Sequence, residues 1–343
     1  MNATIVGVTG YTGTILLKLL VAHPGITGII PVSHSRVGMN VEDVFSFRNN
    51  ALSEKTVLTK SKIVSLQDAL GYNSDIIFST LPHCISAKGI GPFLSDNIII
   101  DLSADMRFDS VALYEKIYKT KHPYPEQAQS ALYGLTEWNN SHIKGNDIIA
   151  NPGCYATATL LPLLPLVKEN IITGDIIINA LSGISGAGKK PDTNLMFCER
   201  SENAGVYAPG KSHRHTAEIT HQLEKEGFSG DVIFNPHLVP MSRGIAVTTT
   251  ANCNDYSEQD IHDVFRSSYK ESPFITFSPD LLPQTAQVRN TNRCIISWKK
   301  EGDKILLFSV IDNLLKGASG QAVQNMNIRL GFEETDGLPL LNI

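Results

Sequence analysis

Short apolar runs alternate with helical periodicity along the first hundred residues. The runs are rich in isoleucine and valine and occupy residues 4–8, 28–32, 75–79 and 98–102, while a helical pattern covers 14–22. Parallel strands need a crossover connection, most often a helix, before the next strand can pair. This alternation therefore predicts βαβ units in which helices cover a parallel sheet.

A different pattern begins after the turn Asn151-Pro152-Gly153. The stretch before it, 108–145, is mostly polar and predicts loops, whereas the chain after it mixes strand-like and helical segments. The strand-like runs lie at 175–180, 231–234, 244–251 and 305–311, and the helical patterns lie at 216–227 and 256–270. We therefore expect an α/β protein in which residues 1–150 hold the parallel sheet and residues 151–314 form an α+β domain.

The end of the chain, about 315–343, is expected to be helical. Ala322, Val323 and Met326 fall on one face of such a helix. This apolar face predicts that the helix packs back on the first domain.

Composition restricts the class of protein. A chain of 343 residues with 42% hydrophobic and 18% charged residues can bury two cores. A net charge of -5 gives no basic surplus for nucleic acid, and no apolar stretch reaches the roughly 20 residues that a membrane span needs. The five cysteines are scattered and never occur as C-x-x-C, which argues against a disulfide framework and a zinc knuckle. No targeting signal is visible, and we expect a reducing, cytoplasmic location.

A glycine-rich turn links the first predicted strand to the first predicted helix. Backbone N–H groups at such a turn point toward a pyrophosphate, although glycine also serves any tight turn. The turn therefore predicts a Rossmann-type dinucleotide site in the first domain. The residues assigned to it are Gly7, Thr9, Gly10, Tyr11, Thr12 and Gly13.

The residues after the second predicted strand indicate which dinucleotide is bound. Folds that select NAD carry an acidic residue there for the ribose 2′-hydroxyl, and this chain has Ser33, Ser35 and Arg36 instead. Hydroxyls and a guanidinium suit a 2′-phosphate, so NADP(H) is favoured. The alternative is that Arg36 is an ordinary solvated surface charge.

A candidate nucleophile follows the turn at the predicted domain boundary. Cys154 lies directly after Asn151-Pro152-Gly153 and before a run of small residues that predicts a helix. Unpaired N–H groups at a helix start stabilise a thiolate, which is the reactive form of cysteine. We interpret the other four cysteines as buried small hydrophobic residues.

A thiol nucleophile needs a partner that moves protons, and a cluster of histidines supplies candidates. His215 and Glu218 lie three apart on a predicted helix, so the carboxylate can orient the imidazole. His213 is a second candidate. The spacing of His213 and His215 also suits a metal, but further ligands are not evident, and a surface cluster without function is the remaining alternative.

Two further segments suit anions. Residues 182–190 are rich in glycine and end in two lysines, and residues 103–107 follow a predicted strand and end in Arg107. Either segment can hold a phosphoryl group. In the first we assign Ser182 and Lys189 to phosphate and Ser185 and Gly186 to the cofactor.

Taken together, these segments resemble the N-acetyl-γ-glutamyl-phosphate reductase family, which is akin to the aspartate-semialdehyde dehydrogenases. The resemblance covers nearly the whole chain, and the order of its motifs is more specific than any one of them. It rests on residues 7–13, 100–105, 133–135, 151–155, 182–188, 213–215, 235–241 and 316–324.

The resemblance implies a reaction and the residues that perform it. It implies NADPH-dependent reduction of an acyl phosphate through a thioester on Cys154, with release of inorganic phosphate and formation of a semialdehyde for arginine biosynthesis. His215 is implied as acid/base, with His213 close behind and Glu218 in support. Arg107 is implied to hold phosphate, and Asn313 to lie by the nicotinamide.

Several alternatives stay open at this point. A sister enzyme acting on aspartyl phosphate or a carrier-bound aminoadipyl phosphate would use the same chemistry, and a non-catalytic NADP-sensing regulator could carry a similar glycine-rich turn. Two-domain dehydrogenases of this kind are usually symmetric, so we expect a homodimer or homotetramer. We expect no nucleic-acid, membrane or metal partner.

Overall fold

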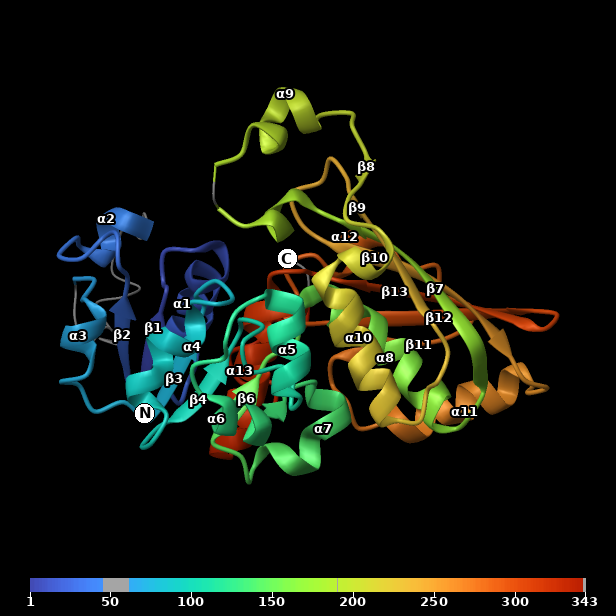
Figure 1. Ribbon diagram of the computed structural model, residues 1–343, viewed down its shortest axis with the longest axis horizontal. Coiled ribbons are helices and arrows are strands. Elements are labelled where there is room, and N and C mark those ends of the chain that lie inside the picture. Colours follow the sequence, from blue (N-terminus) through green and yellow to red (C-terminus); the bar gives the residue numbers. More distant parts are fainter. Residues whose placement is uncertain (46–61, 190, 342–343) are drawn as a thin grey trace. The chain divides into compact units, whose positions relative to one another are not determined.

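The computed structural model describes residues 1–45, 62–189 and 191–341 (Figure 1). The chain divides into two units, each described below by itself. The first comprises Met1–Pro152 and Ala318–Leu338, and the second comprises Gly153–Gly317 and Pro339–Ile343.

The first unit is built on a parallel six-stranded sheet in the order β2-β1-β3-β4-β6-β5. The central strands are continuous apolar runs, as expected where both faces of a parallel sheet are covered. Pro31 lies in β2, at the edge of the sheet, where a missing N–H costs no ladder bond. The strands are β1 (Asn2–Val6), β2 (Gly28–Val32), β3 (Ile76–Ser79), β4 (Ile98–Asp101), β5 (Leu132–Tyr133) and β6 (Ile148–Ala150).

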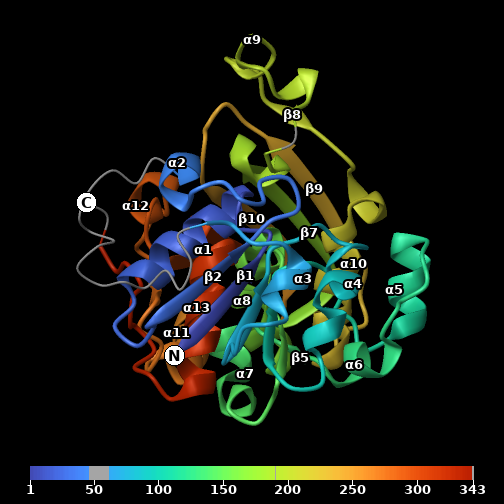
Figure 2. The same cartoon turned by 90° about the vertical axis from the view of Figure 1, so that its left-hand side faces the viewer.

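Helices cover both faces of this sheet (Figure 2). Helix α1 (Tyr11–Ala22) packs against α13 (Gly320–Leu330), while α3 (Leu66–Ala69) and α4 (Ser86–Ile90) bury their apolar residues on the other side. Helix α2 spans Val41–Phe45.

The stretch 108–145, expected to be mostly loop, contains three short helices. They are α5 (Val111–Tyr118), α6 (Pro125–Ser130) and α7 (Thr136–Ile143). Local caps define them: the Ser110 hydroxyl accepts the N–H of Leu113 at 3.3 Å, and α6 starts at a proline. Helices of six to eight residues carry too little apolar periodicity to stand out in the sequence.

The C-terminal helix is shorter than the expected 315–343. A π-helical turn over Leu315–Ser319 precedes α13, which ends at Leu330 because Gly331 adopts the left-handed conformation with φ 76°. Helix α13 contacts α1 and α7 within the first unit. Polar residues are buried on it too: the Asn325 amide donates to the carbonyl of Gly134 at 2.8 Å.

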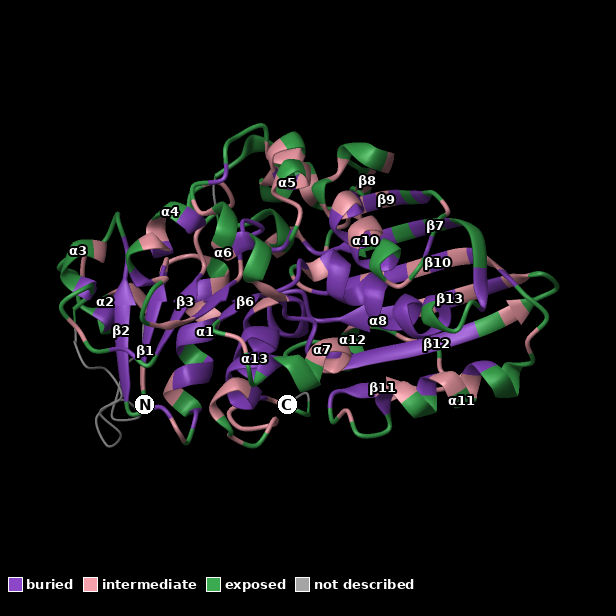
Figure 3. Ribbon diagram, turned by 60° about the horizontal axis from the view of Figure 1, so that its bottom comes forward, coloured by how far each residue is buried: buried purple, intermediate pink, exposed green. Residues whose placement is uncertain are grey.

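The second unit is built on a mixed seven-stranded sheet in the order β11-β12-β13-β10-β7-β9-β8. Buried and exposed residues alternate along β7, so one face of the sheet is covered and the other is open (Figure 3). The strands are β7 (Ile172–Ser182), β8 (Gly205–Val206), β9 (Val232–Leu238), β10 (Ile245–Cys253), β11 (Ile275–Phe277), β12 (Cys294–Glu301) and β13 (Lys304–Ile311).

Helix α8 (Cys154–Lys168) lies over β7, β10 and β13 and is buried along almost all its length. Helices α10 (Arg214–Lys225) and α11 (Glu258–Tyr269) pack against it, and α12 spans Thr285–Val288. Between β7 and β8 the chain forms an arm that carries the short helix α9 (Phe197–Arg200) beyond the β8 edge (Figure 1). This sheet and its helices position the candidate chemistry of the second unit.

Candidate active site

The thiol of Cys154 stands at the start of a buried helix, as the sequence predicted. Cys154 is the first residue of α8, and Gly153, with φ -68° and ψ 149°, is its N-cap. Two anchors fix the helix: the Ser309 hydroxyl donates to the carbonyl of Ala158 at 2.6 Å, and the Tyr269 hydroxyl donates to that of Leu161, also at 2.6 Å. A partly buried thiol at a fixed helix start is well suited to act as a thiolate.

Glu218 ties a second helix to this start. Its side chain is buried with 1% exposure, and its Oε1 accepts the N–H of Gly153 at 2.8 Å. Glu218 lies on α10, one turn after His215, so one carboxylate links the helix that carries the histidine to the helix that carries the thiol. The sequence suggested an orienter for the imidazole, and this contact with Gly153, 65 residues away, could not be read from it.

Gly317 packs directly against the nucleophile. A Cβ at this position would lie 2.8 Å from the Cβ of Cys154 and 3.2 Å from its Cα. The N–H of Gly317 donates to the carbonyl of Asp312 at 3.0 Å, within the tight turn that follows β13. Only a residue without a side chain fits this approach.

Asp312 organises that turn, although sequence reasoning did not single it out. Its Oδ1 accepts the N–H groups of Leu314 and Leu315 at 2.8 and 3.1 Å, and its Oδ2 accepts the N–H of Asn290 at 2.8 Å. The Arg243 guanidinium lies 3.6 Å from Oδ2. The sequence offered one indication of its role, because Asp312 is an acidic residue at the end of an apolar strand and next to Asn313.

Asn313 and Ser185, both assigned to the cofactor from the sequence, lie together. The Asn313 Nδ2 donates to the Ser185 Oγ at 3.0 Å, and its Oδ1 accepts the N–H of Gly244 at 2.8 Å. A Cβ on Gly186 would lie 2.8 Å from the Ser182 Oγ, so Ser182 lies in the same cluster. These residues come from the end of β7 and the turn after β13.

Lys189 is exposed on the arm that follows this cluster, and Lys190 lies outside the described residues. The Ser182 hydroxyl is buried and donates to the carbonyl of Gly183 at 3.0 Å.

The two histidines of the cluster have different surroundings. His213 is the N-cap of α10, and its Nδ1 accepts the N–H of His215 at 3.2 Å. Burial, followed by the positive charge of Arg214, lowers the pKa of His213 to about 4. His215 is part of the first turn of the helix, with its ring centroid 5.0 Å from that of His213.

Two tyrosines border the same site. The Tyr207 hydroxyl donates to the Tyr155 hydroxyl at 3.1 Å, and Tyr155 follows Cys154 directly in the chain. Burial raises the pKa of Tyr155, and burial raises that of Tyr207 to about 12. Both phenols are therefore neutral hydrogen-bonding groups at pH 7. Sequence reasoning missed Tyr207, which directly follows β8 and has no motif around it.

In the first unit, the glycine-rich turn forms a close backbone crossing. Gly7 has φ 94°, and a Cβ there would lie 2.8 Å from the Thr80 Oγ1. A Cβ on Gly13 would lie 2.5 Å from the carbonyl oxygen of Gly7. Gly10 is the N-cap of α1 and has no side chain to cover the helix start. The turn therefore has no room for a side chain at Gly7 or Gly13.

The residues expected to select the dinucleotide lie at the end of β2. Ser33 is buried and its hydroxyl lies 3.3 Å from that of Thr9 in the glycine-rich turn, while Ser35 and Arg36 are exposed. Tyr11 and Thr12, also assigned to the cofactor, are in the first turn of α1.

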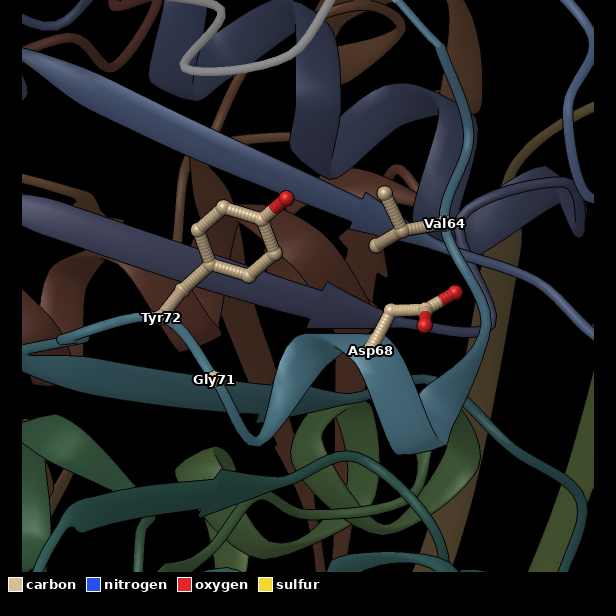
Figure 4. Close-up of a pocket in the computed structure, with 4 residues that line it drawn as sticks. All are labelled: Val64, Asp68, Gly71 and Tyr72. Atoms are coloured by element: carbon tan, nitrogen blue, oxygen red, sulfur yellow. The ribbon is translucent and has the colours of Figure 1, made fainter.

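A pocket of about 490 Å³ lies nearby, beside the edge strand β2 (Figure 4). Its lining residues are Val64, Asp68, Gly71 and Tyr72, and Val64 bridges to Val32 of β2. None of the residues that we assigned to the cofactor is among these four.

Arg107 is buried within the first unit with 7% exposure. Its Nε donates to the carbonyl of Asn151 at 2.8 Å, and its Nη2 donates to that of Leu102 at 2.9 Å. Arg107 thereby holds the turn that leads to Pro152. The preceding segment is fixed by Asp101, whose pKa is raised by burial and whose carboxylate accepts the Ser103 hydroxyl at 2.6 Å.

The described residues contain no group of three or more histidine, cysteine, aspartate or glutamate side chains that could hold a metal ion. None of their helices combines the length and the apolar character needed to cross a membrane.

Family models match most of the chain. The model described as semialdehyde dehydrogenase, NAD binding domain, matches residues 2–146, and the one described as semialdehyde dehydrogenase, dimerisation domain, matches residues 154–313. Both domain types of this family are therefore present, in the order that the two units follow.

Curated relatives match over their whole length. The N-acetyl-gamma-glutamyl-phosphate reductase of Methanosphaera stadtmanae is 39% identical over 354 aligned positions, covering 100% of this chain and 98% of the relative. That of Shouchella clausii is 39% identical and covers 98% of both chains. That of Halothermothrix orenii is also 39% identical, covering 100% of this chain and 99% of the relative.

Solved structures support the fold. Aspartate semialdehyde dehydrogenase II of Vibrio cholerae, complexed with ASA, superimposes with a TM-score of 0.72 at 17% identity, covering 96% of this chain and 98% of that one. Aspartate semialdehyde dehydrogenase of Candida albicans, solved with NADP, gives a TM-score of 0.63 at 15% identity, covering 95% and 97%. The α/β class and the combination of two domain types expected from the sequence are confirmed.

Proposed function

Because the chain belongs to the N-acetyl-gamma-glutamyl-phosphate reductase family, we propose that it reduces N-acetyl-L-glutamyl 5-phosphate to N-acetyl-L-glutamate 5-semialdehyde. The observation that carries the proposal is the thiol of Cys154 at the start of α8, in a chain that matches these relatives from end to end. The reaction releases inorganic phosphate and serves arginine biosynthesis.

In the proposed reaction, the Cys154 thiolate attacks the acyl carbon of the substrate and phosphate leaves with the electron pair of the broken C–O bond. The product is a thioester, which accepts a hydride more readily than a carboxylate does. NADPH, when bound, supplies that hydride. The thiohemiacetal then releases the aldehyde and restores the thiolate.

His215 is proposed as the acid/base of this cycle. It gives a proton to the oxygen that becomes negative on reduction and takes the proton back when the carbon–sulfur bond breaks. Its position on α10, which Glu218 ties to the start of α8, supports this role. Glu218 acts as a positioning residue, because its Oε1 accepts a backbone N–H.

The residues present fit an NADP(H) cofactor. The glycine-rich turn has no room for side chains at Gly7 and Gly13, and its N–H groups at the start of α1 suit a pyrophosphate. Arg36 is exposed and free of acidic neighbours in sequence, so it suits a 2′-phosphate. Ser185 and Asn313 are proposed to hold the nicotinamide end.

Phosphate binding is proposed for Ser182, Lys189 and Arg107. Lys189 is exposed and offers an ammonium group. Arg107 already donates to two backbone carbonyls, so the contribution proposed for it is its positive charge.

We also propose that the protein assembles as a homodimer or homotetramer and is located in the cytoplasm. The open face of the second sheet exposes Ile177 by 41% and Ile233, its partner in register, by 41%. Leu181 on the same strand face is 42% exposed. A second copy of the chain would cover these side chains, and sedimentation of Ile177→Asp against wild type tests this face.

The first test is phosphate-dependent reduction of NADP in the reverse direction with N-acetylglutamate semialdehyde. We expect the NADPH absorbance to rise only when phosphate is present, and only in the wild type when it is compared with Cys154→Ser. Activity with aspartate or aminoadipate semialdehyde alone would leave the thiol chemistry intact and reject the substrate. Full activity of Cys154→Ser would reject the thiol as nucleophile.

A further inference from the structure

The helix that carries His215 begins with an unusual cap. Serine, threonine, aspartate and asparagine are the preferred N-cap residues, because a short side chain can accept an N–H of the first turn. Here a histidine does so: His213 has φ -83° and ψ 131°, outside the helix, and its Nδ1 accepts the N–H of His215 at 3.2 Å. The bond therefore joins one histidine ring to the backbone of the other histidine.

Aromatic rings hold His213 from several sides. Its ring centroid lies 5.7 Å from that of Tyr155, 5.5 Å from that of Tyr207 and 5.2 Å from that of Phe234. The ring of Tyr155 stands nearly perpendicular to it, with an interplanar angle of 89°. Edge contacts of this kind fix the plane of a ring. The imidazole is therefore oriented by its surroundings as well as by its hydrogen bond.

The hydrogen bond also determines where the proton of His213 resides. A neutral imidazole has one donor and one acceptor nitrogen, and Nδ1 is the acceptor here, so the proton is on Nε2. A proton on Nδ1 would break the bond to the N–H of His215. A residue that exchanges protons during each turnover would break and remake this cap every time.

We propose that His213 is a positioning residue for the acid/base His215 and exchanges no proton with the substrate. Its Nδ1 fixes the first turn of α10 and thereby the direction in which the His215 side chain leaves the backbone. This inference rests on the proposed function, because it assigns a separate role to one of the two histidines of that site.

The test separates the hydrogen-bond acceptor from the ring. His213→Asn keeps an acceptor that suits an N-cap, whereas His213→Phe fills the aromatic surroundings without one. His215→Asn removes the proposed acid/base and is the reference. For each we would measure kcat and KM in the phosphate-dependent reverse assay, the pH profile of kcat/KM, and hydrogen exchange of the backbone amide of residue 215.

We expect kcat of His213→Asn to stay within about twofold of the wild-type value. For His213→Phe we expect kcat to fall about fivefold, because loss of an ordinary N-cap changes the equilibrium of a helix start by about this factor. His215→Asn should lose roughly 100-fold or more, as removal of an acid/base does. KM for the semialdehyde should not change in either His213 variant. The pH limb of the acid/base should keep its midpoint in His213→Asn and vanish in His215→Asn.

Three results would overturn the proposal. The first is a fall in kcat of His213→Asn as large as that of His215→Asn, together with loss of the pH limb. The second is full activity of His213→Phe. The third is an unprotected amide of residue 215 in the wild type, or equal protection in His213→Phe and His213→Asn. The exchange measurement needs no turnover, so it tests the hydrogen bond from the amide of residue 215 to His213 even in an inactive protein. If the wild type fails to reduce NADP with this semialdehyde, that result rejects the proposed function and not the N-cap.

Discussion

Adding one methyl group at Gly317 should disable the nucleophile while leaving the chain folded. In Gly317→Ala the new Cβ would meet the Cβ of Cys154 at 2.8 Å, its Cα at 3.2 Å and the Cδ1 of Ile311 at 3.2 Å. Carbon atoms in contact prefer about 3.5–4.0 Å, so roughly 1 Å must be taken up. The Ile311 side chain can move away, but the Cα and Cβ of Cys154 belong to the start of a buried helix and can yield only if the backbone shifts.

The size of the effect follows from that displacement. Overpacking a buried site costs about 1–3 kcal/mol in the free energy of unfolding. The Sγ of Cys154 is bonded to the Cβ that must move, so the thiol shifts with it. A misplacement of about 1 Å at a reacting atom can cost about 100-fold in rate. We therefore expect kcat to fall far more than the stability loss alone would suggest.

The assay compares Gly317→Ala with Gly145→Ala, whose Cβ would meet only the carbonyl oxygen of His142, at 3.9 Å. Urea unfolding gives the stability of each, and phosphate-dependent NADP reduction gives kcat. Alkylation by iodoacetamide, measured on the peptide that contains Cys154 because Cys198 is also exposed, reports the reactivity of this thiol. If Gly317→Ala keeps the kcat, the alkylation rate and the stability of the wild type, the close packing of Gly317 on Cys154 is refuted.

Three further predictions concern single side chains. Glu218→Ala should lose about 1–3 kcal/mol of unfolding free energy, measured in urea, because it leaves a buried N–H unsatisfied. Glu218→Gln keeps an acceptor and should lose about half as much, so equal losses in the two variants would contradict this role. Burial and the charge of Arg214 lower the pKa of His213 from 6.5 to about 4. Between pH 6.5 and pH 4 the unfolded chain therefore binds more protons at this residue than the folded chain does. The stability that is present above pH 6.5 falls as the pH drops toward 4. Urea unfolding at pH 7 and pH 5 should show about 1–2 kcal/mol of this loss in wild type and none of it in His213→Asn. Arg36→Ala should raise KM for NADP roughly tenfold and leave KM for NAD unchanged, and a parallel rise for both would reject a role at the 2′-phosphate.

The sequence predicted the regular parts of the fold well, and physical reasons separate them from the rest. Strands such as β2 are uninterrupted apolar runs, and α11 has strong helical periodicity, so both were evident from residue types alone. Helices α5 to α7 were missed because caps and local turns define them. The early end of α13 depends on the left-handed Gly331, and a glycine in a sequence does not reveal its backbone conformation.

The candidate site was predictable by residue type and less so by contact. The turn before Cys154 indicated a helix start, and α8 does begin there. The contact of Glu218 with Gly153 joins segments 65 residues apart, and that of Arg107 with Asn151 joins segments 44 apart. Tertiary contacts of this kind leave no local pattern in the sequence, so residue types indicated chemical roles for Glu218 and Arg107 but did not reveal these contacts.

Three polar side chains near the proposed nucleophile and acid/base share one property. Glu218 accepts an N–H at the start of α8, His213 accepts one at the start of α10, and Asp312 accepts three in and beside the turn that carries Asn313. Acceptors at helix and turn starts fix where the next residues point, because a buried N–H left unsatisfied there would cost about 1–3 kcal/mol. It follows that variants which keep the acceptor should retain function at these positions, whereas at Cys154 and His215 no substitute with the same hydrogen bonds can replace the thiol or the imidazole.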